Sequence, residues 1–79
     1  MTGADVLTVW TIFREPRDAP PGYRFVVRGF DVGPNGESVP HPTAVAAMTL
    51  AGARAVVPPG LVRWPRDPTD DRHIVESWL

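Results

Sequence analysis

Ten prolines in a chain of 79 residues are the feature that most limits what this sequence can fold into. Proline lacks a backbone N–H and breaks a helix when it stands inside one, so prolines spread along a chain cut it into short segments. Long helices are therefore not expected. The chain is also short enough for one domain at most, and we expect a single small domain over residues 1–79.

Two segments near the N-terminus predict β-strands. The segment Val6–Phe13, VLTVWTIF, is rich in β-branched and aromatic residues, and both of its alternating faces are largely apolar, so we expect a central strand. The segment Tyr23–Val32, YRFVVRGFDV, also alternates and should pair antiparallel with the first across the proline-rich loop 14–22. Gly29 is a candidate β-bulge, and GPNGE at 33–37 is a strong turn signal.

The segment from residue 43 to 57 allows two interpretations. Its alanines favour one continuous helix. Alternatively, Thr43–Met48 is a short strand and Thr49 caps a helix from Leu50 to Val57. We favour the second interpretation, because threonine is a good N-cap and Gly52 would weaken a longer helix.

The last third of the chain predicts a strand followed by a helix. Leu61–Trp64 is expected to be a short strand. Asp67 can cap a helix that begins at Pro68, and the next two aspartates lie where the helix dipole favours negative charge. Apolar residues between Ile74 and Leu79 then recur at helical spacing.

Together these segments predict a small α+β domain. Its sheet would have three or four antiparallel or mixed strands, with two helices on one face. The expected order is strand, strand, optional strand, helix, strand and helix, without internal repeats.

Composition excludes several classes of function. Eight basic and nine acidic residues give a net charge of −1, so the chain lacks the basic excess of most nucleic-acid-binding proteins, and a nucleic-acid partner is not expected. The absence of cysteine excludes thiolate catalysis and cysteine–zinc sites, and the absence of lysine excludes Schiff-base chemistry. No segment is typical of a signal peptide or membrane span, so we expect a cytoplasmic protein with no membrane partner and no cofactor.

Polar residues near the C-terminus have the composition of a hydrolytic triad. Asp70, His73 and Ser77 would share one face of the expected helix. A triad normally draws its members from separate elements, and no glycine-rich elbow is present to form an oxyanion hole, so we expect no catalytic residues. Metal binding by His73, with His41 and the neighbouring aspartates, lacks the spacing of known metal motifs, so no metal is expected.

Arginines and aspartates are interspersed around Trp64. Arg63, Arg66 and Arg72 could bind an anion at the start of the expected helix, but the nearby aspartates leave this region neutral, so we expect ion pairs among them. An exposed tryptophan beside arginine is typical of a protein-binding hot spot. The alternative is that Trp64 packs beneath the last helix.

Four short motifs carry a resemblance: WTIF near the N-terminus, and PPGL, PRDPTDD and IVESWL in the last third. With these motifs the chain resembles short uncharacterised proteins from bacteria and their phages. The resemblance covers roughly half of the chain and does not extend to the alanine-rich middle. It implies no functional residues, because no activity is established for such proteins.

The expected function is a non-enzymatic module that binds another protein. The candidate contact patch consists of Trp64, Arg66, Arg72 and His73. Homodimerisation through a sheet edge stays open, because a domain this small gains stability by association. Two alternatives also stay open: a small metal-dependent or histidine-based hydrolase, and a weak nucleic-acid binder that uses Arg14, Arg24 and Arg28.

Overall fold

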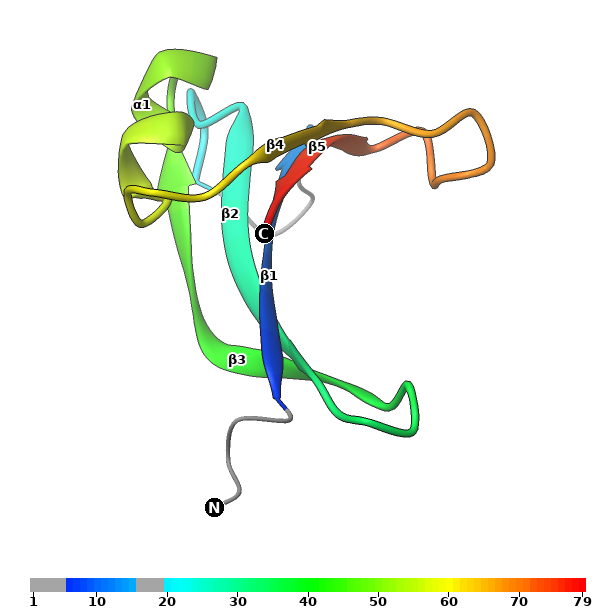
Figure 1. Cartoon of the computed structure of the whole chain (residues 1–79). Helices are drawn as coiled ribbons and strands as arrows, with labels where there is room; N and C mark the ends of the chain where they lie inside the picture. The colour runs from blue at the N-terminus through cyan, green and yellow to red at the C-terminus, as the bar shows by residue number, and fades with distance from the viewer. Residues whose placement is uncertain (1–5, 16–19) are drawn as a thin grey trace.

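The computed structural model describes residues 6–15 and 20–79, and these form a five-stranded sheet with one short helix (Figure 1). The elements in chain order are β1 Leu7–Arg14, β2 Phe25–Val32, β3 Ser38–Ala47, α1 Leu50–Val56, β4 Arg63–Pro65 and β5 Ile74–Trp78. The strand order in the sheet is β3-β2-β1-β5-β4, and neighbouring strands are antiparallel. Thus β1 is central, as predicted, and β3 and β4 are the two edges.

The first hairpin confirms the sequence prediction. β1 and β2 pair along their whole length, from Leu7 opposite Val32 to Arg14 opposite Phe25. The next hairpin turns within the predicted segment 33–37. There Gly36 has a φ of +83°, a conformation that glycine adopts without a steric penalty.

The bulge predicted at Gly29 is present, and it brings His41 across the strand. The pairing of β2 with β3 shifts register at this point. A Cβ atom on Gly29 would lie only 2.6 Å from Nδ1 of His41, so the imidazole ring occupies the space that another side chain would fill. The ring packs edge-on against Trp10, with 5.3 Å between ring centroids, and its Nε2 lies 2.9 Å from Oδ1 of Asp31.

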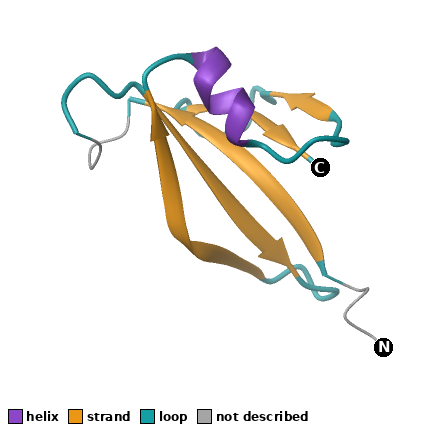
Figure 2. Ribbon diagram, turned by 90° about the vertical axis from the view of Figure 1, so that its left-hand side faces the viewer, coloured by secondary structure: helices purple, strands orange, loops and turns teal. Residues whose placement is uncertain are grey.

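The middle segment forms a strand and then a helix, which confirms the second interpretation. Thr49 is the N-cap of α1, and its hydroxyl oxygen accepts a hydrogen bond from the Gly52 N–H at 3.0 Å. The helix lies against one face of the sheet (Figure 2). The apolar side chains buried in this layer are Ile12, Val27, Ala47, Ala53 and Val57, with Trp10 and Trp78 packed against them.

The predicted C-terminal helix is wrong, and so is the two-helix α+β fold that depended on it. Residues 66–73 form turns, and Ile74–Trp78 is the strand β5. The carboxylate of Asp67 accepts hydrogen bonds from the Thr69 N–H at 2.9 Å and the Thr69 hydroxyl at 2.7 Å. The aspartate that resembled a helix cap therefore stabilises a turn, which is the other structure that aspartate favours.

Tertiary pairing explains why the last segment is a strand. β5 lies between β1 and β4, so its backbone groups have partners on both sides. A bulge shifts its pairing with β1 between Glu76 and Ile74. Val75 and Glu76 consequently both face α1, while Ile74 faces away. Because the bulge interrupts the alternation of side chains between the two faces, the apolar residues of segment 74–79 have a spacing that resembles that of a helix.

Candidate functional site

The β4–β5 hairpin places Trp64 on the sheet face opposite α1. Trp64 pairs with Ser77, whereas its neighbour Arg63 reaches Glu76 on the α1 side. The side chain of Trp64 is 59% exposed. The alternative that it packs beneath a helix is therefore wrong, since β5 occupies the expected place of that helix.

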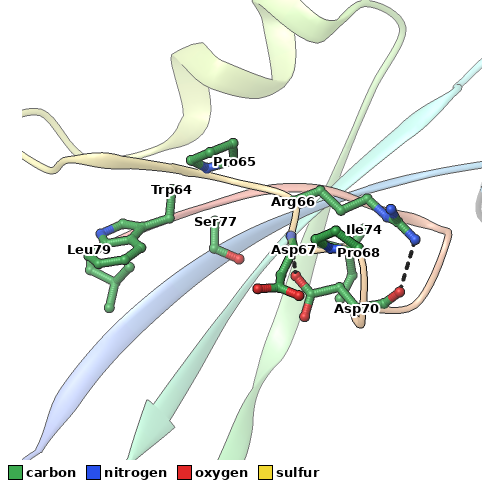
Figure 3. A pocket seen from close by; sticks show the side chains of 9 residues that line it. All are labelled: Trp64, Pro65, Arg66, Asp67, Pro68, Asp70, Ile74, Ser77 and Leu79. Carbon is green, nitrogen blue, oxygen red and sulfur yellow. Dashed lines mark hydrogen bonds between the residues drawn. The ribbon is translucent and has the colours of Figure 1, made fainter.

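Trp64 lines a groove with a volume of about 480 Å³ (Figure 3). At one end of the view the indole lies beside Leu79, and at the other end lie Asp67, Pro68 and Asp70. The full lining consists of Trp64, Pro65, Arg66, Asp67, Pro68, Asp70, Ile74, Ser77 and Leu79. The groove thus joins an apolar aromatic end to an end that carries two carboxylates.

The acidic end of the groove is held by hydrogen bonds within its turn. Asp70 accepts from the backbone N–H of Asp67 at 3.0 Å, and the backbone N–H of Asp70 donates to the Asp67 carbonyl at 2.9 Å. The backbone and hydroxyl hydrogen bonds from Thr69 lower the pKa of the Asp67 carboxyl. Asp67 is therefore charged at neutral pH.

The arginines of this region do not form the expected ion pairs with aspartates. Arg66 donates instead to backbone carbonyls, from Nη2 to Asp70 at 3.0 Å and from Nε to Asp71 at 3.4 Å. Arg63 pairs with Glu76 at 3.3 Å. The guanidinium of Arg66 thus closes the turn through the Asp70 carbonyl (Figure 3), and its charge helps to lower the pKa of Asp67.

Arg72 and His73 lie in the turn that precedes β5 and are not among the groove-lining residues. The Asp71 carboxylate accepts from the backbone N–H of His73 at 2.8 Å and lies 3.0 Å from Nδ1 of the same histidine. These two hydrogen bonds lower the pKa of Asp71. Of the four predicted patch residues, the structure brings Trp64 and Arg66 into one groove and leaves the other two beside it.

The three residues with the composition of a triad, Asp70, His73 and Ser77, do not share a helix face. Ser77 is on β5, where its hydroxyl lies 3.3 Å from that of Thr11, and His73 contacts Asp71 rather than Asp70. His41 is on the edge strand β3, at the opposite side of the sheet from β4. Within residues 6–15 and 20–79, no group of three metal-ligating side chains comes together.

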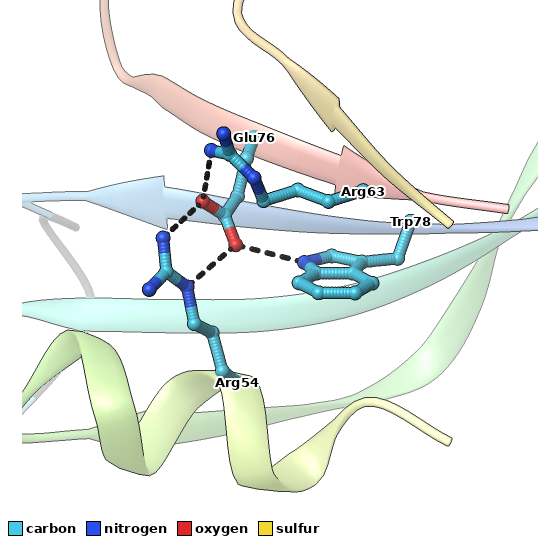
Figure 4. Close-up of polar contacts among 4 residues, drawn as sticks. All are labelled: Arg54, Arg63, Glu76 and Trp78. Atoms are coloured by element: carbon cyan, nitrogen blue, oxygen red, sulfur yellow. Dashed lines mark hydrogen bonds and ion pairs between the residues drawn. The ribbon is translucent and has the colours of Figure 1, made fainter. Parts of the chain in front are cut away.

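A buried carboxylate behind the groove was missed by the sequence reasoning (Figure 4). Glu76 is 1% exposed and accepts four hydrogen bonds. They come from Arg54 Nε at 2.9 Å, Arg54 Nη2 at 2.8 Å, Arg63 Nη1 at 3.3 Å and Trp78 Nε1 at 2.8 Å. The hydrogen bonds from Arg54 hold the pKa of Glu76 below its usual value. This cluster ties α1 to β4 and β5.

The arginines considered for nucleic-acid binding separate into two environments. Arg14 and Arg24 line a second groove, of about 580 Å³, together with Glu15 and Tyr23. Arg28 instead donates a hydrogen bond to the carbonyl of His41. Arg28 is therefore not among the residues that line the groove of Arg14 and Arg24.

No protein-family model, curated protein or solved structure matches the chain. Within the part of the chain that is described, no helix is both long enough and apolar enough to span a membrane. The geometry of the β4–β5 hairpin is therefore the observation that supports a function.

Proposed function

We propose that the chain is a non-enzymatic protein-interaction module that binds an extended segment of another protein in the groove beside Trp64. The observation that carries this proposal is the 59% exposure of the Trp64 side chain at one end of that groove. Tryptophan is enriched among the residues that dominate protein–protein binding energy. A large aromatic side chain left in solvent on a paired, ordered strand is available to such a partner.

The lining of the groove indicates the chemistry of the bound segment. An apolar side chain of the partner would pack against Trp64 and Leu79. A basic side chain would lie next to the carboxylates of Asp67 and Asp70, because Arg66 donates to backbone carbonyls and forms no ion pair with either carboxylate. Charge complementarity of this kind favours correct alignment and fast association.

Arg72 and His73 would contact only a partner that extends beyond the groove. Both lie in the turn next to it, and both have exposed side-chain surface. They belong to the polar rim that typically surrounds the central residues of an interface. We expect their substitution to weaken binding less than substitution of Trp64.

Selection from a random peptide library against the immobilised protein tests the proposal. We expect the enriched peptides to combine an apolar residue with a nearby arginine or lysine. A synthetic peptide of the enriched sequence should shift the NMR signal of the Trp64 indole N–H. It should also bind Trp64→Ala at least about tenfold more weakly, as expected for loss of a hot-spot side chain.

Val39→Ala is the matched control. Val39 is 60% exposed, as Trp64 is, but it lies on β3 at the other edge of the sheet. Its substitution should leave peptide binding unchanged. The proposal is overturned if no peptide is enriched in a Trp64-dependent manner, or if the NMR shifts map to residues outside the groove.

A further inference from the structure

The outer edge of β3 carries no partner strand in the part of the chain that is described. β3 is the last strand of the sheet on its side, and Figure 2 shows it as the outermost long strand. The edge of a sheet exposes unpaired N–H and C=O groups that can pair with another strand. Proteins usually protect such edges with charges, prolines or very short strands.

One half of this edge lacks these protective features. The opposite edge strand, β4, has only three residues and ends in Pro65. The first half of β3 contains Pro40 and Pro42, which cannot donate hydrogen bonds. The second half, Thr43–Ala47 with the sequence TAVAA, contains neither proline nor a charged residue. This segment is therefore the part of the sheet edge that is open to pairing.

The direction of the backbone groups in this segment follows from the pairing with β2. The carbonyl of Ala47 accepts a hydrogen bond from the Arg24 N–H at 3.1 Å, so the backbone of Ala47 is turned toward β2. In an antiparallel sheet, the N–H and C=O groups of successive residues point alternately to the two sides of the strand. Val45 is then also turned toward β2, while the N–H and C=O groups of Ala44 and Ala46 point outward. Two donors and two acceptors are thus offered along the edge.

We propose that a second copy of this chain pairs antiparallel with this edge, segment 43–47 against segment 43–47, to form a homodimer with one continuous sheet. The two-fold axis would pass beside Val45. Ala44 would lie opposite Ala46 of the second copy, and Ala46 would lie opposite Ala44 of the second copy. In each of these two pairs, the N–H of each residue would donate to the C=O of the other. A symmetric dimer closes in this way and leaves neither copy of the segment unpaired.

Two further observations favour a second copy as the occupant. β3 contains no aspartate, glutamate, lysine or arginine, so antiparallel pairing with itself brings no like charges together. Exposed apolar side chains also gather here, since Val45 is 42% and Met48 59% exposed. A dimer through this edge would remove Val45 from solvent and add apolar contact to a core with few buried side chains.

Analytical ultracentrifugation of the full chain over a concentration series tests the proposal. We expect a monomer–dimer equilibrium that Ala46→Pro shifts toward monomer by about tenfold or more, because one outward donor is lost from each copy. Since that N–H makes no hydrogen bond within the monomer, the substitution should preserve the fold. Ala46→Ser retains the N–H and should dimerise like the unsubstituted chain.

Val45→Lys provides a second variant if circular dichroism shows that Ala46→Pro is unfolded. Its charges would meet at the two-fold axis and should also give monomers. The proposal is overturned if the unsubstituted chain is monomeric at every concentration, or if folded Ala46→Pro or folded Val45→Lys dimerises as tightly as the unsubstituted chain. Trp64→Ala lies outside this interface and should dimerise normally, so this test is independent of the groove.

Discussion

Replacement of Glu76 by glutamine should be the most destabilising isosteric change in the chain's polar contacts. The carboxylate is 1% exposed, and its two oxygens accept hydrogen bonds from Arg54, Arg63 and the Trp78 indole. In Glu76→Gln one oxygen becomes an NH₂ group. That group is a donor facing donors, whichever way the amide is turned.

The size of the effect follows from the hydrogen bonds that are lost. Each carboxylate oxygen of Glu76 accepts two of the four hydrogen bonds, so the glutamine side chain, which has one acceptor oxygen, loses two of them. A hydrogen bond to a charged group contributes about 1.5–3 kcal/mol. Arg54 and Arg63 are 43% and 48% exposed and can recover hydration, which reduces the loss. We therefore expect the free energy of unfolding to fall by about 2–4 kcal/mol, or the Tm by roughly 10–25 °C.

Urea and thermal denaturation followed by circular dichroism measure this difference. Glu37→Gln is the matched control, because Glu37 is exposed in the β2–β3 turn, and we expect a change within about 0.5 kcal/mol. If Glu76→Gln were as stable as Glu37→Gln, the carboxylate would not hold α1 to the β4–β5 hairpin, and this account of the cluster would be wrong.

Three further predictions concern acid stability, Trp64 and Gly29. Folding lowers the pKa of Glu76, so the ionised carboxylate contributes to the free energy of unfolding above pH 4.5, and this contribution is lost as the pH falls through the folded-state pKa. The difference in the free energy of unfolding between the unsubstituted chain and Glu76→Gln should therefore shrink when urea denaturation is repeated at acid pH. Trp64→Ala should lower the free energy of unfolding by less than about 1 kcal/mol and remove most of the iodide-quenchable fluorescence. Trp78→Ala should lower the free energy of unfolding by about 3 kcal/mol, and equal losses in the two variants would refute the assignment of Trp64 to the surface and Trp78 to the core. Gly29→Ala should cost about 1–3 kcal/mol by displacing His41, and should cost clearly less in a His41→Ala background in a double-mutant cycle.

The N-terminal half of the fold could be predicted from sequence because its signals are local. The β-branched residues of β1 and the turn glycine Gly36 each act within a few positions of themselves. Thr49 caps α1 through a hydrogen bond to a residue three positions away. Such signals need no knowledge of the rest of the chain.

The C-terminal segment was mispredicted because its local signals suit two structures. Aspartate followed by proline can begin a helix or form a turn, and hydrogen bonding of Asp67 to Thr69 selects the turn. The decisive pairing of β5 is with β1, and it joins Thr11 to Ser77 across the length of the chain. The composition around Trp64 suggested a binding site, but the exposure of the Trp64 side chain depends on the pairing of β5 with β1. Glu76 was missed because Arg54 is 22 positions away.

Side chains along the β4–β5 hairpin alternate between the two faces of the sheet, and the residues on the two faces have different roles. Arg63 and Glu76 face α1 and hold the hairpin to the core, while Trp64 and Ser77 face the groove on the other side. Since Arg63 is one of the three residues of β4, its ion pair with Glu76 helps to hold β4 in position. Loss of that cluster should therefore weaken peptide binding and stability together. Loss of Trp64 should weaken binding alone, and this difference separates a residue that contacts the partner from one that positions the groove.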